Sequence, residues 1–220
     1  MNHRFAIVLL FLLFAETLAG ETPLFDMING YRLSKGLSPL VAEDFLEKTA
    51  DEYCLSLETS GFLSHRDSGG KRVLDRYRKG GGTAVKAGEI LGTSPDLERM
   101  FRAWIDSPSH LDILTGSEWT RVGTALREVD GQLISVVLFS SSLLEKKEIV
   151  LNGEEINLIL TVIPGRQALA RGISSSETGE IALTLERREL PLLLVLEAFE
   201  GEKRVPSDFI YLSDNFLETH

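Results

Sequence analysis

Hydrophobic residues recur with the period of an α-helix in one stretch near the middle of the chain. Between residues 97 and 104 the apolar positions follow the spacing i, i+3, i+4, i+7: Leu97, Met100, Phe101 and Trp104. This spacing places them on one face of an amphipathic helix, which should bury Trp104. Ser94 and Pro95 precede the run, and we expect them to act as the N-cap and a first-turn residue.

A second, shorter helix is predicted to start directly after this one. Ser107 and Pro108 are typical of a helix start, and Ile113 and Leu114 would then turn inward. His110 falls in the first turn of this helix, near the positive end of the helix dipole. Because that end disfavours a further positive charge, the ring of His110 should stay neutral and keep one nitrogen available.

Helices and strands are both predicted elsewhere in the first 140 residues. Helical spacing recurs over residues 24–35, 42–58 and 71–78. An extended segment is expected over residues 84–91, where Glu89 stands among small and apolar neighbours. Two apolar runs, 122–129 and 133–139, are joined by Asp130-Gly131, a dipeptide typical of tight hairpins. This order predicts an α+β fold, arranged in three layers.

The pattern changes near residue 144, after which only strand signals occur. Short apolar or alternating runs are separated by turn residues such as Asn152-Gly153 and Pro164-Gly165. We therefore divide the chain into a first domain over residues 21–144 and a small all-β C-terminal region over residues 145–220. This region is either a β-sandwich domain or a β extension packed on the first domain.

The first twenty residues are typical of a secretory signal peptide. Arg4 precedes an unbroken apolar run over residues 5–15, and small residues suited to cleavage follow at 17–20. Eleven apolar residues are too few to span a bilayer as a helix. We expect cleavage of residues 1–20, a secreted or periplasmic protein, and no transmembrane segment in the mature chain.

Composition and charge narrow the class of partner. The 220-residue chain is 43% hydrophobic, enough for a substantial core, and its formal net charge is −10. An acidic surface repels nucleic acid, so we expect no nucleic-acid partner. The single cysteine, Cys54, excludes an internal disulfide, and its place in a helical apolar pattern predicts a buried side chain.

Two histidines, His65 and His110, are candidates for chemistry. Each follows a serine at the junction of a loop and a helix, but their separation matches no local metal motif. Hydrogen-bonded or exposed histidines would give the same pattern. Two other expectations concern structure alone: Asn29 and Arg32 fix the first helix against the sheet, and the basic cluster over residues 71–79 forms a solvated face.

Several short motifs, in one order, resemble the CAP superfamily of cysteine-rich secretory, antigen 5 and pathogenesis-related proteins, in its exported bacterial form. The motifs are Asn29-Gly-Tyr-Arg32, Gly36-Leu-Ser-Pro-Leu40, Phe62-Leu-Ser-His65, Gly88-Glu89-Ile90, Trp104-Ile-Asp-Ser-Pro-Ser-His110-Leu-Asp-Ile-Leu114 and Val122-Gly-Thr-Ala125. The likeness covers about residues 24–140. It implies a three-layer α-β-α sandwich with a central cleft that is lined by two histidines and up to two glutamates.

The resemblance assigns three cleft residues, His65, Glu89 and His110. Two imidazoles and a carboxylate suit Zn²⁺ and would leave a fourth position open to water. The sequence departs from the family pattern after Glu89, where Ile90 replaces asparagine, and after His110. It also departs at Ser107, where many relatives carry the second glutamate.

Three functions follow from this resemblance. The first is an exported binding or interaction module, with or without a divalent metal, whose partner is a protein, a glycan or a lipid and whose β-rich tail contacts that partner or the cell envelope. The second is a zinc-dependent hydrolase that uses His65, Glu89 and His110, with Glu89 as a metal ligand or a general base. The third is a lipid or sterol carrier. The departures from the pattern, and the lack of a nucleophile beside a base, favour the non-enzymatic binding module.

Overall fold

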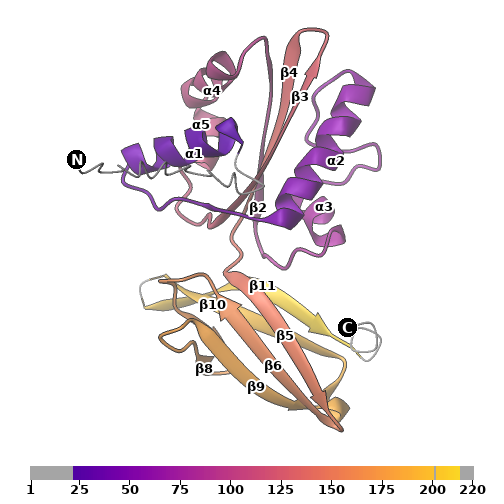
Figure 1. Ribbon diagram of the computed structural model, residues 1–220, viewed down its shortest axis with the longest axis vertical. Coiled ribbons are helices and arrows are strands. Elements are labelled where there is room, and N and C mark those ends of the chain that lie inside the picture. The colour runs from indigo at the N-terminus through magenta and orange to yellow at the C-terminus, as the bar shows by residue number, and fades with distance from the viewer. Residues whose placement is uncertain (1–21, 201, 214–220) are drawn as a thin grey trace, which may run out of the picture.

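The computed structural model describes residues 22–200 and 202–213, so the predicted signal peptide lies outside the described residues. Two lobes lie end to end (Figure 1). We call residues 22–140 the N-terminal lobe and residues 143–213 the C-terminal lobe. Each lobe has its own hydrophobic core.

The N-terminal lobe is built on a four-stranded sheet with the strand order β1-β3-β4-β2. Its strands are β1 (Val41–Ala42), β2 (Ala87–Ser94), β3 (Arg121–Val129) and β4 (Gln132–Ser140). β1 pairs in parallel with β3, while the other pairs are antiparallel. Asp130 and Gly131 both have positive φ, 51° and 73°, as the predicted tight hairpin requires. Strand β2 lies at an edge of this sheet.

Helices cover both faces of this sheet. On one face lie α1 (Pro23–Ser34), α4 (Leu97–Asp106) and α5 (Pro108–Leu114), and on the other lie α2 (Asp44–Ser60) and α3 (Val73–Lys79) (Figure 1). The predicted α+β fold, with helices on both faces of the sheet and an all-β region after it, is confirmed.

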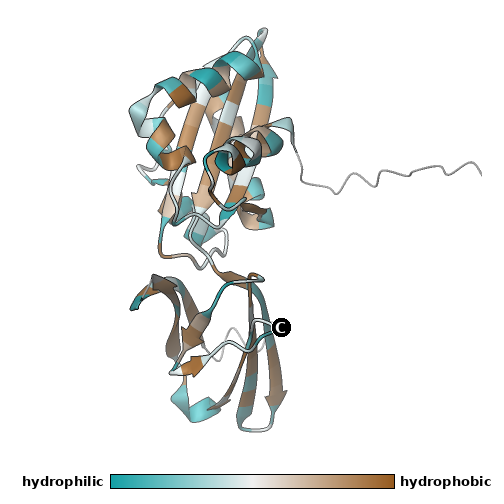
Figure 2. Cartoon of the chain, turned by 90° about the vertical axis from the view of Figure 1, so that its left-hand side faces the viewer, coloured by the Kyte–Doolittle hydropathy of each residue, from teal (hydrophilic) through white to brown (hydrophobic). Residues whose placement is uncertain are grey.

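Side chains along a strand point alternately to the two faces of the sheet, which explains why a helical layer can pack on each face. Along β4, Val137 and Phe139 enter the core beneath α1, α4 and α5, while Val136 and Leu138 enter the core beneath α2 and α3. Figure 2 shows the resulting hydrophobic positions along the strands. Both faces of the strand are therefore apolar, as a sheet between two helical layers requires.

The start of α4 corrects one prediction. Ser94 is the last residue of β2 and is not the N-cap; the N-cap is Asp96, whose carboxylate accepts a hydrogen bond of 2.8 Å from the Arg99 amide. Because Asp96 caps the free amide groups in the first turn of α4, Ser94 is not needed as a cap and belongs to β2, which extends further than expected. Trp104 is 2% exposed and donates from Nε1 to the Leu91 carbonyl at 3.0 Å, as its predicted burial requires.

The second short helix starts where the sequence predicts. Ser107 is the N-cap of α5 and Pro108 is its first residue. Cys54 is fully buried in α2, as expected, and burial raises the pKa of its thiol to about 11. A thiol with that pKa is protonated near neutral pH and does not act as a nucleophile.

The C-terminal lobe contains two sheets that pack face to face around one core. The three-stranded sheet has the order β5-β6-β9 and the four-stranded sheet the order β11-β10-β7-β8. The strands are β5 (Leu144–Asn152), β6 (Glu155–Val162), β7 (Ala168–Ala170), β8 (Ile173–Ser174), β9 (Glu180–Glu186), β10 (Leu192–Glu200) and β11 (Lys203–Leu212), and a 3-10 turn, η1 (Arg187–Glu189), follows β9.

Strand β11 connects the two lobes. Ala84 of the N-terminal lobe forms a β-bridge with Asp208, and the Phe209 amide donates to the Thr83 carbonyl at 2.9 Å. The lobes therefore share backbone hydrogen bonds as well as the covalent connection. Whether residues 145–220 form an independent domain or an extension of the first domain stays a prediction.

Gly123 of β3 provides a first test of the packing between sheet and helix. A Cβ atom at this position would lie 2.3 Å from the backbone nitrogen of Glu47 and from the carbonyl carbon of Leu46, both in α2. Because backbone atoms cannot move aside cheaply, we expect Gly123→Ala to lower the free energy of unfolding by about 2 kcal/mol. Urea unfolding measures this change. Gly30→Ala is the control, since a Cβ there meets nothing within 4 Å and alanine favours the helix.

Candidate functional site

The candidate site is centred on Glu89, whose side chain is 3% exposed on edge strand β2. Its Oε1 atom lies 2.7 Å from Nδ1 of His65, which belongs to the loop between α2 and α3. Its Oε2 atom accepts a hydrogen bond from the Arg76 guanidinium of α3. Both carboxylate oxygens are therefore engaged, and three separate segments of the chain meet at this residue.

Arg76 is held in place by its own contacts. Its guanidinium carbon lies 3.5 Å from the centroid of the Tyr53 ring, and Nη1 donates to the Lys71 carbonyl at 2.9 Å. The Tyr53 hydroxyl in turn donates to the Ser64 carbonyl, next to His65. The cluster formed by His65, Glu89, Arg76 and Tyr53 is therefore a connected unit, which we call the Glu89 cluster.

Burial of Arg76 corrects the prediction of a solvated basic face over residues 71–79. Its side chain is only 9% exposed, whereas Arg78 and Lys79 of the same helix are exposed. Sequence reasoning missed Arg76 as a site residue. A signal was present, because Arg76 follows Val73 by three residues and so lies on the helix face that turns inward.

Opposing effects act on the charge of Glu89. Burial raises the pKa of its carboxyl group, while the positive charge of Arg76 and the hydrogen bond from His65 lower it. A buried carboxylate is stable only where nearby groups compensate for the lost water. Arg76 supplies a permanent charge for that purpose, and His65 supplies a hydrogen bond.

His110 lies apart from the contact between His65 and Glu89. Its Nδ1 atom is buried and has no hydrogen-bond partner among the described residues. Burial lowers the pKa of His110, and the charge of His65 lowers it further. The ring is therefore neutral near pH 7, as predicted, although the main cause is burial and not the helix dipole.

The geometry of the sheet explains this separation. Glu89 and Leu91 are two residues apart on β2, so their side chains point to the same face of the sheet, the face covered by α2 and α3. Helix α5 packs on the opposite face. His110 and His65 can approach each other only around the free edge of β2. Among the described residues, no group of three His, Cys, Asp or Glu side chains is placed to hold a metal ion.

The zinc site implied by the resemblance, with His65, Glu89 and His110 as ligands, stays a prediction, and the donor set argues against it. Zinc in a catalytic site takes three protein ligands and one water. Here the carboxylate that would serve as the third ligand is paired with a guanidinium, so a metal ion bound to Glu89 would be repelled by the charge of Arg76.

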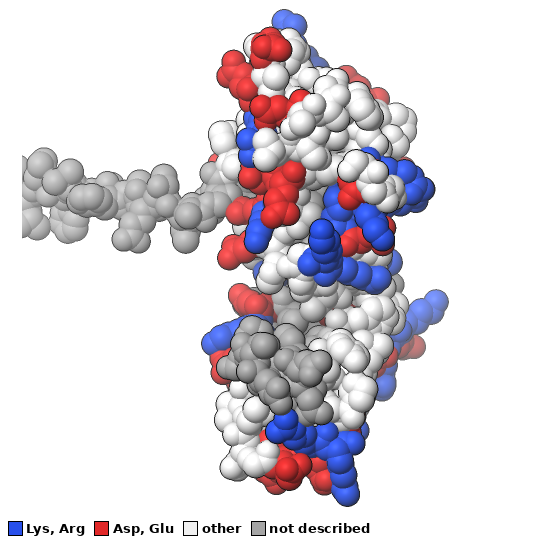
Figure 3. Space-filling model, turned by 90° about the vertical axis from the view of Figure 1, so that its right-hand side faces the viewer, with Lys and Arg blue, Asp and Glu red and all other residues white. Residues whose placement is uncertain are grey.

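A cavity of about 590 Å³ opens beside Arg76 between α2 and α3, and Lys48, Tyr53 and Asp67 are among its lining residues. Figure 3 shows the side of the molecule on which α2 and α3 lie, where basic and acidic side chains are mixed. The net acidity of the chain is therefore not concentrated on this face.

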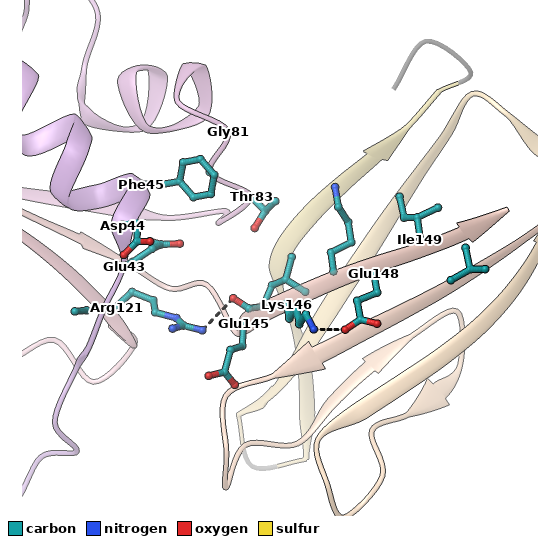
Figure 4. Close-up of a pocket in the computed structure, with 15 residues that line it drawn as sticks. Glu43, Asp44, Phe45, Gly81, Thr83, Arg121, Glu145, Lys146, Glu148 and Ile149 are labelled. Atoms are coloured by element: carbon teal, nitrogen blue, oxygen red, sulfur yellow. Dashed lines mark hydrogen bonds and ion pairs between the residues drawn. The ribbon is translucent and has the colours of Figure 1, made fainter. Parts of the chain in front are cut away.

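A larger cavity, of about 940 Å³, lies between the lobes (Figure 4). The start of α2, residues 81–83 and strand β5 line it, and Arg121 at its wall donates to the Leu144 carbonyl at 3.0 Å. Neither cavity is lined by His65, Glu89 or His110. The Glu89 cluster is the candidate site because it joins His65 and Glu89, two of the residues that the resemblance assigns, through a buried ion pair with Arg76.

The N-terminal lobe is similar to known proteins. The model of the CAP family, described as the cysteine-rich secretory protein family, matches residues 25–139. An uncharacterized protein of Borreliella burgdorferi is 32% identical over 117 residues, which cover 53% of this chain and 75% of that protein.

Two solved structures are also similar. An outer surface protein of Borrelia burgdorferi is 31% identical, with a TM-score of 0.50, and the match covers 53% of this chain and 87% of that chain. An extracellular protein of Bacillus anthracis that contains an SCP domain is 20% identical, with a TM-score of 0.47 and coverage of 53% and 38%. Over the described residues, no helix has both the length and the apolar character needed to cross a membrane. Because the family match covers more than half of the sequence, this chain belongs to the CAP superfamily, as one of its bacterial members.

Proposed function

We propose that this protein is a non-enzymatic binding module that acts outside the cytoplasm and recognises its ligand at the edge of β2, between His65 and His110. The observation that carries the proposal is the double engagement of Glu89 by His65 and Arg76. The fixed positive charge of Arg76 makes this carboxylate a weaker base and a poorer cation ligand than a free one, which favours binding over catalysis.

The histidines supply the recognition chemistry. The His65 side chain is 60% exposed, and Glu89 orients its ring through Nδ1. His110 has a neutral ring with an unpaired buried Nδ1 atom. Oriented imidazoles donate to and accept from hydroxyl, amide or headgroup oxygens, which suits a protein, glycan or lipid ligand. In the described part of the chain, no serine, threonine or cysteine side chain hydrogen-bonds to either ring, and so neither activates a nucleophile.

The proposed location has two supports. The first twenty residues have the charge and hydropathy pattern of a cleaved export signal. The related Borrelia burgdorferi protein is an outer surface protein, and the Bacillus anthracis protein is extracellular. The C-terminal lobe would then contact the cell envelope and not the ligand.

Binding arrays test this proposal. Labelled protein would be applied to immobilised glycans, lipids and extracellular matrix proteins, in parallel with the variant His65→Ala/His110→Ala. We expect at least one ligand whose affinity falls tenfold or more in the double variant. The pair Leu193→Ala/Tyr211→Ala is the control, because it alters an exposed cross-strand pair of the C-terminal lobe and should leave this affinity unchanged.

The same preparation would be assayed for cleavage of peptides and polysaccharides with and without Zn²⁺. Metal-dependent cleavage that disappears in His110→Ala would contradict the proposal and favour the hydrolase. Loss of binding in the control pair, with no loss in the histidine variant, would move the recognition surface to the C-terminal lobe.

A further inference from the structure

We propose that Arg76 takes the place of a divalent cation in the Glu89 cluster: its guanidinium is the built-in counter-ion of Glu89, and the site works without a metal. This inference deepens the proposed function and rests on it for the statement that the edge of β2 is a binding site. It concerns a residue from the basic helix α3 that no family motif quoted above contains.

The first argument is charge compensation. Glu89 is buried, and an uncompensated carboxylate would be unstable there. In a metal site the cation would neutralise it, but here the guanidinium contacts Oε2 and does the same. A dication placed at the same carboxylate would meet a fixed positive charge at close range in a poorly hydrated site, where repulsion is strong.

The second argument is that Arg76 is not free to move aside. It is stacked on Tyr53 of α2, bonded to the backbone of Lys71 and bonded to β2 through Glu89. Its Nε atom is fully buried, without a partner in the described part of the chain. Removing the guanidinium from this position would break contacts with three segments at once.

The third argument concerns the nitrogen donors that remain. His65 directs Nδ1 to Glu89, which leaves its other ring nitrogen for a ligand, and His110 belongs to α5, whose Leu114 packs on the other face of the sheet. With Glu89 paired to Arg76, two imidazoles are one short of the three protein ligands of a catalytic zinc site. The arrangement therefore keeps the imidazoles for hydrogen bonding.

Zinc binding to the purified protein tests the inference. Isothermal titration with ZnCl₂, supported by elemental analysis, would compare the wild type with Arg76→Gln and with Arg78→Gln. The latter removes the same charge from the exposed face of the same helix. We expect the wild type and Arg78→Gln to bind zinc equally weakly, and Arg76→Gln to bind it at least tenfold more tightly. Tight stoichiometric zinc in the wild type that is lost in His65→Ala/His110→Ala would overturn the inference, as would equal affinities in all folded variants.

A second measurement covers the case in which Arg76→Gln folds but is too unstable for the zinc titration. The variant Arg76→Gln/Glu89→Gln removes both charges and should melt at a higher temperature than Arg76→Gln alone, because no buried charge is left unpaired. Equal or lower melting of the double variant would overturn the counter-ion role. Ligand binding is measured separately in the presence of EDTA. Loss of binding in EDTA would contradict the metal-free inference alone. Absence of any ligand whose binding depends on the histidines would contradict the proposed function alone.

Discussion

Replacing Arg32 by alanine is expected to destabilise the protein by about 3 kcal/mol or more. Arg32 of α1 is only 1% exposed, and its guanidinium donates to the carbonyls of Ser38, Leu114 and Gly116 at 2.9–3.1 Å. Hydrogen bonds from a charged donor are stronger than neutral ones, and alanine would leave these carbonyls without their donor. Denaturant unfolding followed by circular dichroism measures the change.

Two controls give this prediction its specificity. Arg102→Ala removes an exposed arginine from α4 and should change stability by less than about 0.5 kcal/mol. Arg32→Lys keeps the charge but cannot reach three carbonyls in different directions, so it should fall between alanine and the wild type. Equal stability of Arg32→Ala and Arg102→Ala would show that α1 is not held in the described way.

A loss of similar size, about 3 kcal/mol, is expected for Asp208→Ala in strand β11. The carboxylate is fully buried and accepts four hydrogen bonds: from Thr83 at 2.6 Å, Ser142 at 2.6 Å, the Leu143 amide at 2.9 Å and Ser207 at 2.9 Å. Two of the donors lie outside the C-terminal lobe: Thr83 belongs to the N-terminal lobe and Ser142 to the connection between the lobes. Differential scanning calorimetry measures both the size of the loss and its effect on cooperativity.

The position of Asp208 makes the shape of the transition informative. If Asp208 joins the lobes, the wild type should unfold in a single transition, and that transition should broaden or separate into two in Asp208→Ala. Asp112→Ala, which removes an exposed carboxylate from α5, should leave the transition unchanged. A variant that loses stability but keeps one sharp transition would show that other contacts couple the lobes.

The helices and the hairpin of the N-terminal lobe could be predicted because local patterns determine them. The apolar stripe that ends at Trp104, the proline after Ser107 and the dipeptide Asp130-Gly131 each carry their signal within a few residues. The start of α4 could not be placed as well, because Ser94 and Asp96 are both good N-caps and only the length of β2 decides between them.

The candidate site was predictable in part. The resemblance led to His65 and Glu89, and the structure places these two in contact. Arg76 was missed, since an arginine in a basic run is usually solvated and only the tertiary approach of α3 to β2 reveals its ion pair. The separation of His110 from Glu89 depends on which face of β2 the Glu89 side chain points to, and a short sequence motif does not show this.

The contact between the lobes was also beyond sequence reasoning. Asp208 and Thr83 are 125 residues apart, and neither belongs to a recognisable motif. The strand signals after residue 144 indicated a β-rich region but did not indicate which strand would bridge to Ala84. Contacts of this kind depend on how complete sheets pack and not on local periodicity.

The most direct test of the central claim is a crystal structure of the protein grown with excess Zn²⁺. The account predicts that the Arg76 guanidinium stays hydrogen-bonded to Glu89 and stacked on Tyr53, with no zinc ion on that carboxylate. A zinc ion bound jointly by His65, Glu89 and His110, with Arg76 turned out into solvent, would contradict it.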